Sequence, residues 1–123
     1  MKKILILLIF LFCTNVHSFE KKTNFTFEKF KKAQDNNKTI VVNSWNKTCS
    51  TCAIQSKILA KAIKDFKEAE FFFYEQIKYN EFAEALNIKF WSTIVVFKGQ
   101  NEVAREIGLR NKEDIYQIIK KGI

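Results

Sequence analysis

The sequence predicts an α/β domain with a central mixed β-sheet that is covered by helices on both faces. Short apolar runs rich in β-branched and aromatic residues alternate with segments whose apolar residues recur at helical spacing. The last two extended segments flank a turn at 98–101, which is typical of an antiparallel hairpin. Alternating strands and helices with one hairpin call for a mixed sheet between two helical layers.

The first 18 residues have the features of a signal peptide. Two lysines precede an unbroken apolar run over 4–13, and Val16-His17-Ser18 resembles a cleavage site of small residues. The run is shorter than the roughly 20 residues that cross a bilayer. We expect cleavage after Ser18, a single mature domain over 19–123 with no stable membrane span, and a periplasmic or secreted location. An uncleaved anchor and a lipoprotein modified at Cys13 are the alternatives.

The first half of this domain predicts a helix, a strand and a second helix. Apolar residues at helical spacing over 27–34 lead into a turn-like Asp-Asn-Asn cluster. Residues 40–45 predict a buried strand, because three consecutive β-branched apolar residues follow that turn. Apolar residues then recur every three to five positions over 53–67, which predicts an amphipathic helix.

In the second half, the sequence predicts an aromatic-rich strand at 71–77, then a short helix, two hairpin strands and a last helix. A short helix over 80–87 has an asparagine at each end, and we expect both to cap it. Residues 93–97 and 102–107 form the hairpin. Asn111 begins the last helix, which has acidic residues in its first turn and lysines in its last, as the helix dipole favours.

After removal of the first 18 residues the chain keeps two cysteines, Cys49 and Cys52, and no histidine. This inventory excludes a histidine general base, a Cys-His or Ser-His-Asp nucleophile system and a one-chain zinc site of four Cys or His ligands. A bridge across two intervening residues closes a very small loop, and such a bridge is a poor structural staple. The pair therefore predicts redox chemistry.

The chain is basic, with a formal net charge of +8. Its lysines are interspersed with acids, as over 61–68, which is typical of a solvated helix face and not of a nucleic-acid-binding block. We expect no nucleic-acid partner.

Two segments resemble the thioredoxin family. The first is the strand, turn and cysteine pair Ile40-Val41-Val42-Asn43-Ser44-Trp45-Asn46-Lys47-Thr48-Cys49-Ser50-Thr51-Cys52, in which Trp45 lies four residues before the first cysteine. The second is Thr93-Ile94-Val95-Val96-Phe97-Lys98-Gly99 with the later Glu102-Val103 and Ile107-Gly108, which resemble the family's last two strands. A CxxC alone is weak, but in this strand–helix context it is a strong signal.

The resemblance covers roughly 27–123 and implies a thioredoxin-like fold and thiol–disulfide oxidoreductase activity. It implies disulfide-containing or dithiol partner proteins and an unidentified redox donor, no cofactor or metal, and a monomer. Cys49 would lie at the N-terminus of the helix that Cys52 enters, so that its pKa falls below the usual value of about 8.5 and it acts as the nucleophile. Cys52 would then resolve the mixed disulfide.

Eight further residues are expected to bind substrate or support the dithiol: Asn43, Trp45, Thr48, Ser50, Thr51, Trp91, Ser92 and Thr93. Ser50 and Thr51 replace the family's frequent Gly-Pro and either stabilise the thiolate or satisfy N–H groups at the helix start. Trp45 is expected to pack against the dithiol as a shield and contact surface, and Trp91 to offer an aromatic contact. An ordinary core position is the alternative for both tryptophans.

Three positions depart from the family pattern. Asn43 stands where thioredoxins usually have a buried Asp, and Phe73 stands at the usual buried Lys position. An amide accepts no proton at neutral pH, so we expect slow release of mixed disulfides. Ser92 stands where the family has a cis-proline. A cis bond before a residue other than proline costs about 3–4 kcal/mol, so the Trp91–Ser92 bond is expected to be trans.

Two other functions stay open at this point. The chain could be a thioredoxin-like protein-binding module with a vestigial dithiol, which the loss of the proline and the charge pair favours. It could also bind a metal or an iron–sulfur cluster across a dimer, with two CxxC pairs supplying four thiolates.

Overall fold

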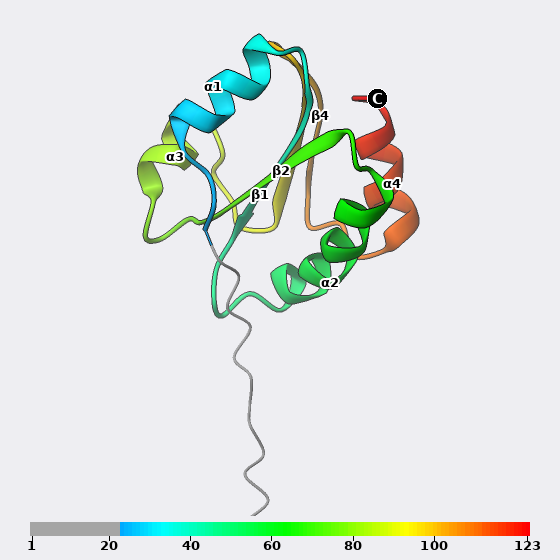
Figure 1. The fold of residues 1–123 in the computed structure, drawn as a ribbon. Helices are drawn as coiled ribbons and strands as arrows, with labels where there is room; N and C mark the ends of the chain where they lie inside the picture. Colours follow the sequence, from blue (N-terminus) through cyan, green and yellow to red (C-terminus); the bar gives the residue numbers. More distant parts are fainter. Residues whose placement is uncertain (1–22) are drawn as a thin grey trace, which may run out of the picture.

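The computed structural model describes residues 23–123, so the expected signal peptide at 1–18 lies outside the described residues. Helices and strands alternate along this part of the chain (Figure 1). The elements are α1 (Phe27–Asp35), β1 (Thr39–Trp45), α2 (Ser50–Asp65), β2 (Ala69–Glu75), α3 (Asn80–Ala85), β3 (Thr93–Lys98), β4 (Asn101–Ile107) and α4 (Lys112–Lys120).

The strands form a four-stranded mixed sheet in the order β2-β1-β3-β4. Strand β1 runs parallel to β2 and antiparallel to β3, and β3 runs antiparallel to β4. All residues of β1 are buried, as expected for a strand inside a sheet that is covered on both faces. Because of these directions, β1 and β2 end at the same edge of the sheet at which β3 begins. The loop from β1 to α2 and the loop before β3 therefore meet there.

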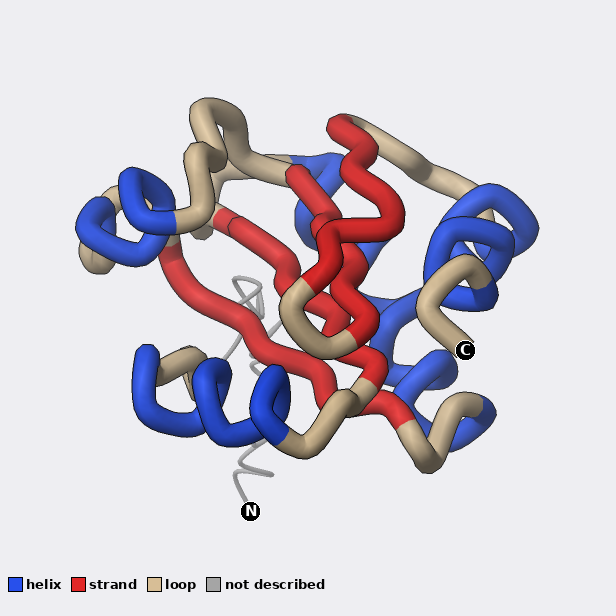
Figure 2. Tube along the Cα trace, turned by 90° about the horizontal axis from the view of Figure 1, so that it is seen from above, coloured by secondary structure: helices blue, strands red, loops and turns tan. Residues whose placement is uncertain are grey.

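Helices cover both faces of the sheet, as Figure 2 shows. Alternate residues of β1 point to opposite faces, so Val41 packs with α2 and α4, whereas Ile40 and Val42 pack with α1 and α3. The face toward α1 and α3 is rich in aromatic rings, including Phe25, Phe30, Phe72, Tyr74, Phe82 and Phe97. The predicted mixed sheet between two helical layers is confirmed.

Residues before α1 cover the edge of β2. The side-chain amide of Asn24 donates to the Phe71 carbonyl at 3.0 Å and accepts from the Phe73 N–H at 2.6 Å. The Thr23 hydroxyl accepts from the Glu75 N–H at 3.2 Å. These contacts occupy backbone groups that an open sheet edge would offer to another chain.

Three expected elements have different boundaries in the structure. Helix α2 spans Ser50–Asp65 and not 53–67, and β2 spans Ala69–Glu75 and not 71–77. Asn80 does not cap α3, because it is the first helical residue and its side chain donates to the Glu84 carboxylate at 2.9 Å. Asn87 does end α3, with a φ of +53° one residue beyond the C-cap, and the side chain of Asn111 caps α4 as expected.

Candidate active site

Cys49 and Cys52 form a disulfide across the first turn of α2, with their Cα atoms 5.2 Å apart. Cys49 is the N-cap residue of this helix, and its sulfur accepts a hydrogen bond from the Cys52 N–H at 3.1 Å. The first N–H groups of a helix have no partner within the helix, and the N-terminal end of the helix dipole is positive. A Cys49 thiolate formed by reduction is therefore stabilised at this position.

The two sulfurs differ in accessibility. Cys52 is 0% exposed and belongs to the apolar core between the sheet and the helices α2 and α4. Cys49 is half-buried and lines a groove of about 640 Å³. The groove is lined by Thr48, Cys49, Ser50, Thr51, Lys89, Phe90, Trp91 and Ser92. A molecule in this groove thus meets Cys49 and not Cys52.

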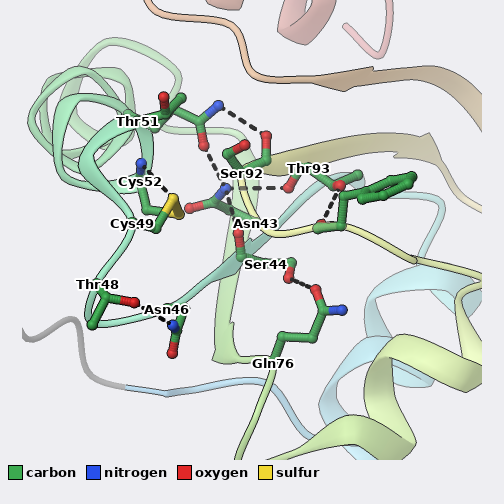
Figure 3. The surroundings of a disulfide bond; sticks show 12 residues. Asn43, Ser44, Asn46, Thr48, Cys49, Thr51, Cys52, Gln76, Ser92 and Thr93 are labelled. Carbon is green, nitrogen blue, oxygen red and sulfur yellow. Dashed lines mark hydrogen bonds between the residues drawn. A yellow bond between two sulfur atoms is a disulfide. The ribbon is translucent and has the colours of Figure 1, made fainter.

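The remaining residues around the turn have the following places. Trp45 is 1% exposed, lies in the same apolar cluster as Cys52, and is not among the residues that line the groove. The Thr48 hydroxyl accepts from the Asn46 side-chain amide at 3.0 Å (Figure 3), which orders the loop before Cys49. The Thr51 hydroxyl accepts from the Arg110 guanidinium at 2.8 Å, so a cation from the β4–α4 loop lies at the start of α2.

Ser92 takes the place of the family's proline with a left-handed backbone. No cis peptide bond occurs within residues 23–123, so the Trp91–Ser92 bond is trans, as expected, and the φ of Ser92 is +58°. Its N–H donates to the Ser44 carbonyl at 2.9 Å, and its own carbonyl accepts from the Gly108 N–H at 3.0 Å. Residues other than glycine occupy this region at some cost in energy, which the surrounding structure must offset.

A network of neutral amides lies beneath the disulfide. Figure 3 shows Asn43, Ser92 and Thr93 gathered beside it. Asn43 is 0% exposed, and its amide donates to the side-chain oxygen of Gln55 at 3.1 Å and to the Thr93 carbonyl at 3.2 Å. The amide nitrogen of Gln55 donates to the carbonyls of Ser92 and Leu109, both at 3.0 Å. Neither member of the family's charged pair is present, because Asn43 and Phe73 occupy the two positions. Phe73 is a buried core residue.

Gln55 is a site residue that the expected set did not include. The buried residues of α2 are Cys52, Gln55, Leu59 and Ala62, which follow one another at helical spacing. The signal was therefore present in the sequence: a glutamine lies on the same helix face as the second cysteine, where an apolar residue would ordinarily pack.

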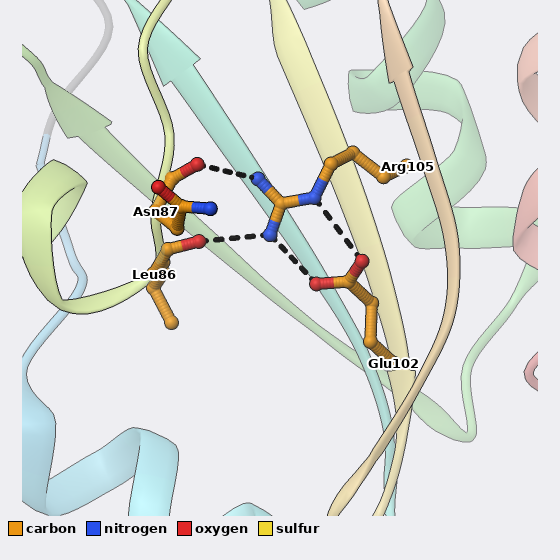
Figure 4. Close-up of polar contacts among 4 residues, drawn as sticks. All are labelled: Leu86, Asn87, Glu102 and Arg105. Carbon is orange, nitrogen blue, oxygen red and sulfur yellow. Dashed lines mark hydrogen bonds and ion pairs between the residues drawn. The ribbon is translucent and has the colours of Figure 1, made fainter.

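Two other unpredicted side chains anchor the loop that forms one wall of the groove. Arg105 of β4 donates to the carbonyls of Leu86 and Asn87 at 2.8 and 3.0 Å, while Glu102 holds its guanidinium from the other side (Figure 4). The Gln76 amide donates to the Lys89 carbonyl at 3.4 Å, and its oxygen accepts from the Ser44 hydroxyl at 2.5 Å. The segment from the end of α3 to Ser92 is thus tied to the sheet at several points.

Tyr74 provides no base to this site. It lies opposite Ser44 in the β1–β2 register, and burial raises the pKa of Tyr74 to about 12 against a smaller opposing effect of the Ser44 hydroxyl. The phenol therefore stays neutral at physiological pH. Within residues 23–123 no three His, Cys, Asp or Glu side chains gather in a way that could hold a metal ion. No helix in that range is long and apolar enough to span a membrane.

The family model for thioredoxin matches residues 19–121. The chain belongs to the thioredoxin family. It is 29% identical over 91 residues to a thioredoxin H-type of Fagopyrum esculentum, covering 74% of this chain and 78% of that protein. It is 32% identical over 81 residues to the thioredoxin of Mycoplasma genitalium, covering 66% and 79% of the two chains.

Solved structures agree with this assignment. The thioredoxin of Fasciola hepatica superposes with a TM-score of 0.67 at 26% identity, covering 78% of this chain and 93% of that one. Trxlp from Edwardsiella tarda shares the fold, with a TM-score of 0.73 at 16% identity over 77% and 94% of the two chains. Together with the cysteine pair at disulfide distance, family membership makes this chain a thiol–disulfide oxidoreductase. Thioredoxins act in general on disulfide-containing proteins.

Proposed function

We propose that this chain is an exported thiol–disulfide oxidoreductase in which Cys49 is the nucleophile and Cys52 the resolving thiol. The observation that carries this assignment is the unequal placement of the two sulfurs: Cys49 lines the groove, and Cys52 is completely buried behind it. The N-cap position of Cys49 adds to it, because a thiolate is favoured there.

In the reducing direction the Cys49 thiolate attacks one sulfur of a partner disulfide. The partner's S–S bond breaks, its other sulfur leaves as a thiolate, and a mixed disulfide with Cys49 forms. Cys52 then loses its proton to water or to the departing thiolate and attacks the Cys49 sulfur. The partner leaves with both cysteines reduced, Cys49 and Cys52 are joined again, and two electrons have passed to the partner. A dithiol donor restores the starting state.

Trapping of the mixed disulfide tests these roles. In the full-length protein expressed in its native cells, Cys52→Ala leaves Cys49 able to attack and removes the thiol that releases the partner. We expect covalent adducts that disappear on reduction with dithiothreitol and whose mass spectra name the partners. The double variant Cys49→Ala/Cys52→Ala is the control and should form none. Adducts with Cys49→Ala in place of Cys52→Ala would reverse the assignment.

The side chains of the groove wall indicate which part of a partner protein binds in the groove. Phe90 is 59% exposed and Trp91 is 39% exposed, and both line the groove together with the cation of Lys89. We propose that they contact apolar residues next to the partner's disulfide, since exposed aromatic side chains contribute disproportionately to protein–protein contacts.

Replacing these side chains with alanine should weaken the binding of protein substrates and leave the reaction with small disulfides nearly unchanged. For Phe90→Ala and Trp91→Ala we expect KM for a protein disulfide to rise by about 10-fold, the effect of losing one strong contact residue. The rate with a small aromatic disulfide should stay within about twofold, because the sulfurs are untouched. Ile123→Ala, an exposed apolar position beside the far end of β1, is the control. Equal losses with both substrates would show that the aromatic residues do not act through partner docking.

Export is supported by the N-terminal sequence, which has two lysines, an apolar run of signal-peptide length and a cleavage-site pattern at Val16-His17-Ser18. We propose a periplasmic or secreted monomer that begins at Phe19. Mass spectrometry of the protein from native cells should find Phe19 as the N-terminal residue in the exported fraction. An intact N-terminus in the cytoplasmic fraction would contradict export without affecting the redox assignment.

A further inference from the structure

Gln55 is a fully buried polar residue, and its hydrogen bonds are directed at the surroundings of the disulfide. It lies three residues after Cys52 on the buried face of α2 and is 0% exposed. Its amide nitrogen bonds to the carbonyls of Ser92 and Leu109, and its oxygen bonds to the Asn43 amide. Both ends of this amide are therefore satisfied, as buried polar groups require.

These three bonds join the helix that carries the cysteines to three other segments. Asn43 belongs to β1, Ser92 to the loop that forms a wall of the groove, and Leu109 to the β4–α4 loop. Ser92 is held in a left-handed backbone conformation with a φ of +58°. Such a conformation persists only where neighbouring groups determine it, and the Gln55 amide is one of the few groups that bond to its carbonyl.

The chemistry of the network requires a neutral side chain at 55. The Ser92 and Leu109 carbonyls both accept, so they need N–H donors, and the Asn43 nitrogen donates, so it needs an acceptor. A primary amide supplies two donors and an acceptor, whereas a carboxylate supplies acceptors alone. The amides of Asn43 and Gln55 and the carbonyls that they bond to do not titrate, in contrast to the charged pair that the family usually places there.

We propose that Gln55 is a positioning residue for thiol–disulfide exchange, holding the Ser92 wall of the groove and the Leu109 loop against the helix that carries Cys49 and Cys52. Because its amide carries no charge, Gln55 contributes no titration of its own to the pH dependence of exchange. This role applies to the exchange reaction itself and is independent of the direction of electron flow and of the compartment.

The first test compares Gln55→Leu with Gln34→Leu. Gln34 also donates its amide to one backbone carbonyl, that of Gly99 at 3.2 Å, at the end of the sheet remote from the disulfide. Single-turnover reduction of dithiodipyridine by the pre-reduced proteins measures the attack. We expect Gln55→Leu to react about 10- to 100-fold more slowly, the effect of displacing reacting groups by up to an ångström. Gln34→Leu should stay within about twofold. A Gln55→Leu rate within twofold of wild type would overturn the proposal.

The second test is a pH profile of Gln55→Glu, which keeps the shape of the side chain and remains informative if Gln55→Leu does not fold. A protonated carboxyl can donate to one of the two carbonyls, and an ionised one to neither. Burial raises the pKa of such a carboxyl, so it is protonated at about pH 5 and ionises as the pH rises. The ratio of variant to wild-type rates in the folded protein should be highest at about pH 5 and fall toward pH 8. A ratio that is constant over this range, with only the melting temperature lowered, would reduce Gln55 to a structural role.

Discussion

Ser92→Pro is expected to lower the free energy of unfolding by about 3 kcal/mol or more, although proline is the family's residue at this position. The proline ring holds φ near −65°, whereas the φ of Ser92 is +58°. The substitution also removes the N–H that donates to the Ser44 carbonyl at 2.9 Å. Urea unfolding followed by tryptophan fluorescence measures the change as a shift in midpoint at constant slope.

Ser92→Gly is the matched control for this prediction. Glycine adopts a positive φ at no steric cost and retains the N–H, so the native bonds of residue 92 survive. Its greater freedom in the unfolded chain offsets part of the gain, and the expected change is between zero and about 1 kcal/mol of added stability. If Ser92→Pro proved as stable as wild type, the left-handed loop would not be the conformation that the fold requires.

The fold could be predicted from the sequence because each helix and strand of its layers depends on a pattern of residues within a single segment. The period of apolar residues located the helices and strands, and Asn111 followed a capping preference that is local to its helix. The apolar period alone placed the start of α2 at 53, three residues late, although the family resemblance implied that Cys49 lies at the N-terminus of this helix. Its N-cap is the sulfur of Cys49, and capping preferences assign that role to Ser, Thr, Asp or Asn.

The redox role of the cysteine pair could likewise be predicted from its spacing. The residues that hydrogen-bond to the backbone around the pair could not. Gln55, Gln76 and Arg105 all donate to backbone carbonyls of the segment between α3 and β3. Each residue of a chain carries the same carbonyl, so the sequence does not say which of them a distant amide or guanidinium will meet. The loss of the family's Asp and proline was visible in the sequence, whereas the polar network that stands in their place depends on tertiary contacts.

Asn43→Asp, which restores the family's buried acid, is expected to cost about 3 kcal/mol of stability at neutral pH. The Asn43 amide donates to the Gln55 oxygen and to the Thr93 carbonyl, and both partners are acceptors. A carboxylate has no N–H to donate, so the Gln55 oxygen and the Thr93 carbonyl would lose their donor and face a buried negative charge, which costs more than an unpaired neutral group. Rotation of the Gln55 amide would not help, because its oxygen would then face the carbonyls of Ser92 and Leu109.

The sign of the pH dependence follows from the same contacts. Burial and the two acceptor oxygens that face position 43 raise the pKa of an aspartate there above its unfolded value of about 3.9. Between the unfolded pKa and the raised folded pKa of this carboxyl, the folded state binds more protons than the unfolded state. Stability therefore falls as the pH rises through this window. Urea unfolding at about pH 5 and about pH 8 should show a deficit relative to wild type that is larger at the higher pH. Asn101→Asp is the control, because Asn101 is exposed and water can solvate its carboxylate.

The same variant separates two explanations of turnover. If the missing acid limits resolution, folded Asn43→Asp releases mixed disulfides faster than wild type in single-turnover measurements, despite its lower stability, because a carboxylate can take the proton of Cys52. If the neutral network is what keeps the groove wall in place, release is slower and follows the loss of stability with pH. A stability deficit that does not grow with pH would show that the carboxylate is not destabilised by the acceptors around it, and would contradict the role assigned to the neutral network.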